Sequence, residues 1–251
     1  MALDFTEHFI KHLKNADRIM FFTGAGISAE SGIPTFRGKD GIWNKLKPEE
    51  LANFEAFMRN PDMVWEWYQY RRKIVNDAKP NKGHLAIAEM ENLFSEVTVV
   101  TQNVDNLHNR AGSSKVYELH GNIERNYCVD CKTFYSDKDW DYNKAPHCVN
   151  CGGLIRPDVV WFGEFLPEDQ FMGGEKAASL CDICFVVGTS AVVYPAAYIP
   201  LTAKQSGALI VEVNIEHTEL SRQADYTFLG QSGDVLPEIV KKLKELKKND
   251  F

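Results

Sequence analysis

The sequence predicts an α/β fold, a Rossmann-like parallel sheet with a smaller domain made of a helical insertion and a four-cysteine module. Apolar runs rich in β-branched residues alternate with helical patterns, which is typical of parallel strands covered on both faces. A glycine-rich turn follows the first run, and two Cys-x-x-Cys pairs interrupt the alternation. The expected strands span residues 18–23, 97–101, 115–119, 183–188, 208–213 and 225–229.

Composition narrows the classes of protein. With 251 residues, of which 44% are hydrophobic, the chain is long enough for one large core and a smaller one. The 28 basic and 35 acidic residues give a net charge of −7, which argues against a nucleic-acid surface and slightly favours basic partners. Residues 1–14 form an amphipathic pattern, and no apolar run approaches a membrane span. We expect a cytoplasmic protein with no membrane partner, whose cysteines are thiols or metal ligands.

The glycine-rich turn Gly24-x-Gly26-x-x-Ala29 favours a dinucleotide ligand. Such a turn between a strand and a helix places a pyrophosphate against backbone N–H groups at the helix N-terminus. The acidic residue expected about 20 positions later has no clear counterpart, because Trp43 and Asn44 stand there. An ordinary strand with a glycine turn explains the two glycines, but not the Pro34 loop that follows.

Polar residues follow several of the expected strands. Gln102, Asn103 and Asp105 come after 97–101, and His120 comes after 115–119. Because the carboxyl ends of parallel strands share one edge of a sheet, these side chains are expected around one ligand. A histidine at such a strand end can act as a general base near neutral pH.

Four cysteines predict a metal site. Cys128-x-x-Cys131 and Cys148-x-x-Cys151 have the spacing of a four-thiolate zinc site, which leaves no open position and is therefore structural. His147, next to Cys148, is an alternative ligand, but it would replace a cysteine only if the paired Cys-x-x-Cys spacing were given up. Cys181 and Cys184 run into an apolar strand and are expected to be core thiols.

The helix expected near 61–77 carries Tyr68 and Arg71 three positions apart, hence on one face. A phenol and a guanidinium together can hold a carboxylate; stacking on neighbouring aromatic residues is the alternative. Residues 156–164 are expected to form an extended edge, which can accept a peptide by backbone hydrogen bonds.

The chain resembles the sirtuin (Sir2) family of NAD-dependent protein deacylases. The family signature GAGxSxxSGIPxFR is matched from Gly24 to Arg37, TQNxDxLH from Thr101 to His108, ELHG from Glu118 to Gly121, and VVxFGE from Val159 to Glu164. The resemblance extends over nearly the whole chain.

The resemblance implies NAD as co-substrate, one structural zinc ion and acyl-lysine protein substrates. The expected products are free lysine, nicotinamide and O-acyl-ADP-ribose. His120 is the implied catalytic base, and Val160, Phe162 and Gly163 the implied substrate contacts. The implied NAD contacts are Gly24, Ala25, Gly26, Ile27, Ser28, Ile33, Phe36, Arg37, Gln102, Asn103, Asp105, Gly188, Thr189, Ser190, Asn214 and Ser232.

Tyr68 and Arg71 match the Tyr-x-x-Arg motif of sirtuins that remove succinyl, malonyl or glutaryl groups, with Ala52 as the counterpart of a small pocket residue. Residues 1–37, 80–121 and 158–251 are expected to form the NAD-binding domain. Residues 38–79 and 122–157 are expected to form the helical and zinc-binding parts of the small domain.

Two other classes use some of the same residues. A hydride-transferring NAD-dependent oxidoreductase also needs the glycine turn, but it produces NADH. A zinc-ribbon nucleic-acid-binding protein also uses four cysteines, but it needs a basic stripe beside them. The basic residues beside the cysteines, Arg125, Lys132, Lys138 and Lys144, stand among several acids, so direct nucleic-acid binding is not expected.

Overall fold

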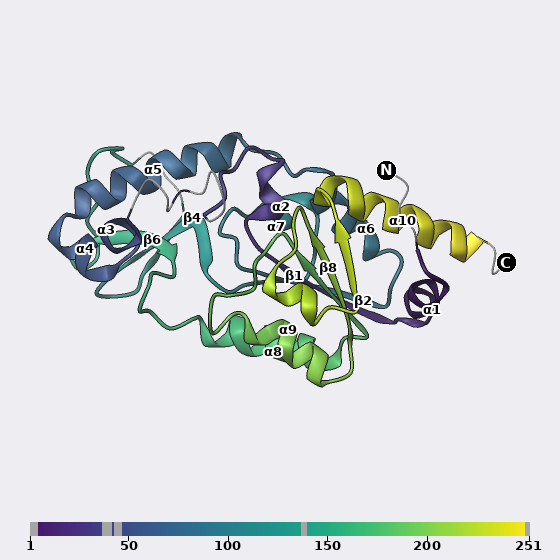
Figure 1. Ribbon diagram of the computed structural model, residues 1–251. Helices are drawn as coiled ribbons and strands as arrows, with labels where there is room; N and C mark the ends of the chain where they lie inside the picture. Colours follow the sequence, from purple (N-terminus) through teal and green to yellow (C-terminus); the bar gives the residue numbers. More distant parts are fainter. Residues whose placement is uncertain (1–4, 37–41, 43–46, 137–139, 249–251) are drawn as a thin grey trace.

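Figure 1 shows an elongated molecule with both termini at one end. The computed structural model describes residues 5–36, 42, 47–136 and 140–248. The end with the termini holds a six-stranded sheet and its covering helices, and the opposite end holds a smaller group of helices and strands.

The larger sheet is parallel throughout, as the sequence predicts. Its spatial order is β3-β2-β1-β7-β8-β9. The chain therefore builds from β1 towards one edge and then returns to place β7 on the other side of β1. In such doubly wound sheets ligands bind where the strand order reverses, here between β1 and β7. The strands are β1 Arg18–Thr23, β2 Glu96–Thr101, β3 Val116–Glu118, β7 Ile183–Val187, β8 Leu209–Asn214 and β9 Tyr226–Leu229.

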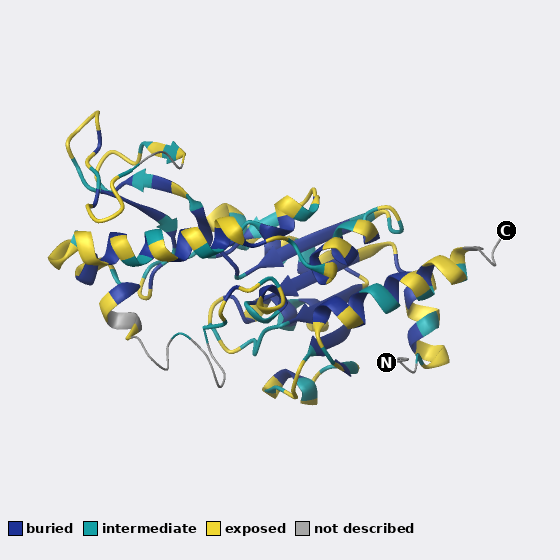
Figure 2. Ribbon diagram, turned by 90° about the horizontal axis from the view of Figure 1, so that it is seen from above, coloured by how far each residue is buried: buried dark blue, intermediate teal, exposed yellow. Residues whose placement is uncertain are grey.

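Helices cover both faces of this sheet, with buried sides against the strands and exposed sides outward (Figure 2). α1, α6 and α10 contribute to the core on one face, and α8 and α9 to the core on the other. Cys181 and Cys184 lie buried in the second core, which confirms them as core thiols, and burial raises the pKa of Cys181 to about 12. The helices are α1 Glu7–Asn15, α6 Lys82–Met90, α8 Glu168–Leu180, α9 Tyr198–Gln205 and α10 Ser232–Lys248.

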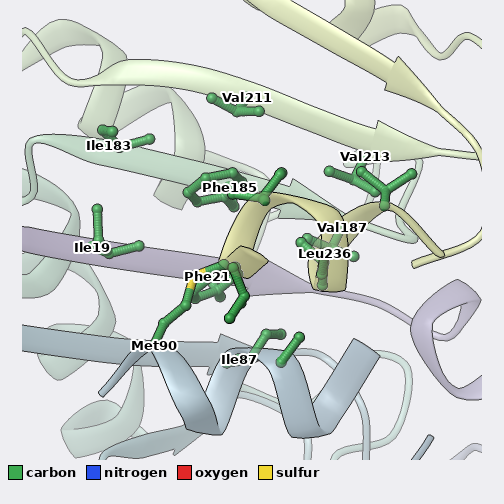
Figure 3. Packing of buried hydrophobic residues seen from close by; sticks show 14 of the residues in the cluster. Ile19, Phe21, Ile87, Met90, Ile183, Phe185, Val187, Val211, Val213 and Leu236 are labelled. Atoms are coloured by element: carbon green, nitrogen blue, oxygen red, sulfur yellow. The ribbon is translucent and has the colours of Figure 1, made fainter. Parts of the chain in front are cut away.

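The two cores follow from the alternation of side chains along each strand. In β1, Ile19 and Phe21 enter one core while Met20 and Phe22 enter the other. Figure 3 shows the first core, where Phe21 and Phe185 lie beside Ile87 and Met90 of α6 and Leu236 of α10. The rings of Phe21 and Phe185 stack with their centroids 5.0 Å apart. Burial of both strand faces fixes the register and holds the strand ends in place.

The smaller end combines three helices with an antiparallel sheet of order β5-β4-β6 (Figure 1). Asn53 and Asn60 cap α4 and α5 with their side-chain oxygens, which explains where these helices begin. Their apolar faces share a third core with Val159 and Trp161, which lie at and just beyond the end of β6. The elements are α3 Pro48–Leu51, α4 Phe54–Arg59, α5 Pro61–Asp77, β4 Gly121–Cys128, β5 Phe134–Ser136 and β6 Ile155–Val159.

The extended segment predicted for 156–164 is only partly extended. β6 ends at Val159, and the chain then turns, with Glu164 N donating to Trp161 O over 3.0 Å. Gly163 adopts φ +87°, a conformation that favours glycine and ends the strand geometry. Across the described ranges, no helix has the length and apolar composition that crossing a bilayer requires.

Candidate active site

Two glycine turns meet where the strand order reverses. Gly26 N donates to Gly188 O over 2.8 Å, which joins the turn after β1 to the turn after β7. A Cβ atom on Gly26 would lie 2.7 Å from Gly188 Cα, and one on Gly188 would lie 2.3 Å from Ile27 N. Gly188 also has φ +60°. Only glycine permits this close approach, which leaves backbone rather than side chains at the rim between β1 and β7.

His120 stands just beyond β3 with its imidazole orientation fixed. Its Nδ1 lies 2.9 Å from Gln102 O, and because a carbonyl oxygen only accepts, Nδ1 carries the proton. In neutral His120 the second nitrogen, Nε2, is therefore an unprotonated base, and no described residue bonds to it. Burial lowers the pKa of His120, although the Gln102 bond opposes the shift, so the basic form predominates at neutral pH.

Asn103, Ser28 and Asp105 form a buried network behind the rim. Asn103 Nδ2 donates to Gly24 O at 3.0 Å and to Ser28 Oγ at 3.2 Å, and Ser28 Oγ donates to Asp105 Oδ2 at 2.7 Å. Burial raises the pKa of Asp105, while hydrogen bonds from Leu107 N and Ser28 oppose the shift. The network ties the glycine turn to the segment after β2.

Two histidines, His84 and His108, lie beneath this network. His84 Nε2 is 3.5 Å from Ser28 Oγ, and its ring meets the ring of His108 edge-on at 4.9 Å. His108 Nε2 is 2.9 Å from Thr23 Oγ1 at the end of β1. Burial lowers the pKa of His84 to about 4 and holds the pKa of His108 well below its ordinary value, so both rings are neutral at neutral pH. The missed signal is Asn81-x-x-His84, since the two residues cap α6 reciprocally.

The other side of the rim is held by polar side chains. Gln102 Nε2 donates to Thr189 Oγ1 at 3.0 Å, and Asn214 Nδ2 donates to Thr189 O at 3.1 Å. These bonds join the ends of β2, β7 and β8. Ser190, next to Thr189, is half-buried.

Three other predicted NAD contacts have different surroundings. Ser232 is buried at the start of α10 and donates to Glu30 Oε1 at 3.0 Å. Ile33 belongs to the core of the smaller end, and Phe36 lies under the guanidinium of Arg71. Arg37 is outside the described residues.

Tyr68 and Arg71 lie together on the buried face of α5. Trp161 Nε1 donates to Tyr68 Oη over 2.8 Å. The Arg71 guanidinium carbon is 4.6 Å from the ring centre of Phe36 and 5.1 Å from that of Trp67. No carboxylate among the described residues pairs with Arg71. Burial raises the pKa of Tyr68 and lowers that of Arg71, and Arg71 still carries its charge at neutral pH.

The turn after β6 runs beside these groups. Val160 N donates to His120 O at 2.9 Å, and Phe162 N donates to Ala52 O at 3.0 Å. The turn thus connects the predicted base to the predicted acyl pocket. Phe162 and Gly163 are exposed, while Val160 is half-buried.

The four predicted zinc ligands converge. The Sγ atoms of Cys128, Cys131, Cys148 and Cys151 all lie within 4.8 Å of one another. Two of the Sγ pairs are 3.5 Å apart, close to the separation of about 3.8 Å that tetrahedral Zn–S bonds of about 2.3 Å require. The cluster fits one structural zinc ion. Tyr135 Oη lies 3.0 Å from Cys148 Sγ and helps lower the pKa of that thiol to about 6.

Comparisons with known proteins agree with this arrangement. The Sir2 family model matches residues 24–195. NAD-dependent protein deacylase 2 of Pyrobaculum aerophilum is 52% identical over 92% of this chain and 93% of its own length. The NAD-dependent protein deacylase of Pyrococcus furiosus is 50% identical over 95% and 98% of the two chains.

Solved structures extend the comparison to bound ligands. A mutant Sir2 homologue in complex with ADP-ribose superposes with a TM-score of 0.94 at 44% identity, covering 97% of this chain and 98% of that one. A Sir2 complex with a p53 peptide and NAD+ superposes with a TM-score of 0.83 at 34% identity, covering 97% and 98%. The first confirms the fold predicted from the sequence. The homologues in these complexes bind ADP-ribose or NAD+, and the four-cysteine cluster of this chain fits the single structural zinc ion predicted from the sequence.

Proposed function

Because this chain belongs to the Sir2 family of NAD-dependent protein deacylases, we propose that it removes acidic acyl groups as well as acetyl groups from protein lysines. NAD supplies the ADP-ribosyl group that takes the acyl group, and the products are free lysine, nicotinamide and O-acyl-ADP-ribose. The relatives named above are NAD-dependent protein deacylases, so we propose this activity rather than hydride transfer or nucleic-acid binding.

His120 is the proposed general base, and its geometry is the observation that carries the proposal. Gln102 O holds the protonated Nδ1, which leaves Nε2 to take a proton from a ribose hydroxyl. The lowered pKa keeps that nitrogen unprotonated at neutral pH. Asn103 and Asp105 lie on the neighbouring strand end, where we propose that they orient the nicotinamide ribose.

The remaining NAD contacts are proposed along the same rim. The glycine turn at 24–28 is the proposed contact of the pyrophosphate, and Gln102 with residues 188–190 is proposed to line the ribose side. Asn214 is the proposed contact of the adenosine ribose, which would replace the missing acid after the glycine turn. Ser232 is the proposed contact near the adenine, although its hydroxyl already bonds to Glu30.

Tyr68 and Arg71 are the proposed ligands of an acidic acyl group. Trp161 uses its only polar hydrogen on the Tyr68 oxygen, so that oxygen accepts and the phenol hydrogen is left to donate. Arg71 adds a buried positive charge that contacts the rings of Phe36 and Trp67 and interacts with the Asp105 carboxylate without forming a close ion pair among the described residues. A succinyl or malonyl carboxylate is proposed to supply a direct ionic partner and to accept from both donors.

The substrate peptide is proposed to lie along Val160, Phe162 and Gly163, with the zinc ion holding the sheet from which this turn emerges. The small domain is proposed to comprise residues 38–79 and 122–157. All six cysteines are free of disulfides, in agreement with a reducing cytoplasm as the proposed compartment.

The test of His120 uses NAD and an acyl-lysine peptide. We expect nicotinamide release with deacylated peptide and no absorbance from reduced nicotinamide. His120→Ala should abolish turnover because the base is lost, while NAD and peptide still bind by calorimetry. Retained turnover in this variant would reject the role of His120, and NADH formation would reject the reaction class.

The test of the acyl pocket compares acetyl-lysine and succinyl-lysine versions of one peptide. Arg71→Met keeps a long apolar side chain but removes the charge, so desuccinylation should fall about tenfold or more while deacetylation changes little. Tyr68→Phe, which removes only the hydroxyl, should shift the ratio in the same direction. A wild type inactive on succinyl-lysine, or an unchanged ratio in Arg71→Met, would reject the acidic-acyl assignment.

A further inference from the structure

Two histidines on α1 have no role in the site described above. His8 and His12 are four positions apart, both are exposed, and their Nε2 atoms lie 3.3 Å from each other. Residues four apart lie on one face of a helix, so the two imidazole nitrogens converge on the same point in solvent. Figure 1 places α1 at the opposite end of the molecule from α5.

We propose that His8 and His12 form a second metal site, which binds a divalent transition-metal ion such as Zn²⁺, Ni²⁺ or Co²⁺. Imidazole nitrogen suits these ions, whereas Mg²⁺ and Ca²⁺ take oxygen ligands. Two metal–nitrogen bonds of about 2.1 Å to atoms 3.3 Å apart give an N–metal–N angle of roughly 104°, between octahedral and tetrahedral values. The pair therefore has chelating geometry.

Tyr226 contacts the His8 ring at Nδ1, the ring nitrogen that does not face His12. His8 Nδ1 lies 2.6 Å from Tyr226 Oη, and Thr6 Oγ1 donates to the same oxygen over 3.2 Å. A metal-binding histidine ordinarily donates its other ring N–H to a neighbouring oxygen, which leaves the ligating nitrogen unprotonated. The Tyr226 oxygen is placed to accept from His8 Nδ1 when Nε2 binds the ion. It also packs against Phe9 of α1 with ring centroids 5.0 Å apart, so the site is held on the sheet.

The site differs from the four-cysteine centre in being open. Across the described ranges no third histidine, cysteine, aspartate or glutamate joins the pair, so two histidine nitrogens and water complete the coordination of the ion. We therefore expect an exchangeable ion rather than a permanent one. Because the ion would join two successive turns of α1 and bind only the folded chain, it should raise the unfolding temperature, with a stabilisation that grows with the logarithm of the ion concentration above the Kd.

Ni²⁺ titration of the zinc-loaded full chain tests the site. Calorimetry should give one Ni²⁺ bound per chain at about pH 7.5. His8→Gln and His12→Gln should each abolish this isotherm. Tyr226→Phe, which keeps the ring against Phe9, should weaken it about tenfold or more. The matched control is His217→Gln, an exposed histidine elsewhere, which should bind as the wild type does.

Two results would overturn the proposal. One is Ni²⁺ binding that survives both His8→Gln and His12→Gln; the other is binding that His217→Gln removes equally. A measurement on the unaltered chain gives an independent check. Bound Ni²⁺ is paramagnetic, so it should broaden the ring-proton NMR signals of His8 and His12 before those of His217. Equal broadening of all exposed histidines would mean that Ni²⁺ binds nonspecifically to surface imidazoles, and it would contradict a specific site at His8 and His12.

Discussion

At the scale of single residues, burial decides which protonation states the site can use. His84 and His108 lie beneath Ser28 and Thr23, where no water solvates a charged ring. Their neutral rings can accept hydrogen bonds, which a protonated ring cannot do. The cost of protonating them links the stability of the whole fold to pH.

His84 should make the protein less stable in acid. The unfolded chain binds a proton near the ordinary pKa of 6.5, but folded His84 stays neutral to about pH 4. The unfolded state therefore binds more protons between these values, and the free energy of unfolding falls as pH falls, by up to about 3 kcal/mol. His84→Asn, which retains hydrogen-bonding groups, should show a shallower fall in urea unfolding at pH 7.5, 6 and 4.5. Equal slopes in the two proteins would contradict this account.

Trp161 should control acyl selectivity through a single hydrogen bond. Trp161→Phe removes the indole N–H and leaves the Tyr68 hydroxyl free to rotate, so kcat/KM for succinyl-lysine should fall about tenfold, corresponding to about 1.4 kcal/mol. Deacetylation should change much less. Phe57→Leu is the matched control, because Phe57 packs on Trp161 without bonding to Tyr68. In a Tyr68→Phe background Trp161→Phe should have no further effect, and an additive loss would contradict the coupling.

At the scale of elements, the sequence predicts what local pattern determines and misses what distant contacts determine. The strands follow from the β-branched runs, and the start of α5 follows from a Pro after an Asn cap. The metal site follows from the spacing of the cysteine pairs. The bond between Trp161 and Tyr68 joins residues 93 positions apart and leaves no periodic signal. The turn that begins after Val159 was missed because the apolar run continues through Trp161 and Phe162. Periodicity predicts elements, but the meeting of two elements depends on tertiary packing.

The contact between the two glycine turns should be intolerant of a single methyl group. Gly188→Ala combines a left-handed backbone with a Cβ only 2.3 Å from Ile27 N, so unfolding free energy should fall by about 2 to 5 kcal/mol. NAD affinity should fall with it, because the rim between β1 and β7 opens. Gly207→Ala is the control: φ is +93° but no atom lies within 4 Å of the added Cβ, so only about 1 to 2 kcal/mol is expected. Equal losses in urea unfolding would show that close approach is unimportant.

At the scale of the whole molecule, the four-cysteine region lies outside the two cores of the parallel sheet, whereas the third core joins the two ends through Ile33, Val104 and Leu107. The cores on the two faces of the parallel sheet contain no residue of the four-cysteine region, and the small core around Cys128, Cys148 and Ile155 contains no strand of that sheet. The zinc-binding region is instead hydrogen-bonded to α5. Trp65 Nε1 donates to Asp141 O, and Ala145 N donates to Asp62 Oδ1, both at 2.9 Å. Loss of zinc should therefore affect one end first.

Removal of zinc by a strong chelator should loosen β5 and residues 145–155 while the parallel sheet stays folded, because four thiols without metal have no apolar core of comparable size to hold them. Hydrogen exchange should show lost protection in that region and retained protection in β1 and β7. Deacylation should fall about 100-fold, because β6 positions the turn at Val160 beside His120. Restoring zinc should recover both readouts. Simultaneous loss of protection in β1 would show that the two ends unfold as one unit and would contradict this prediction.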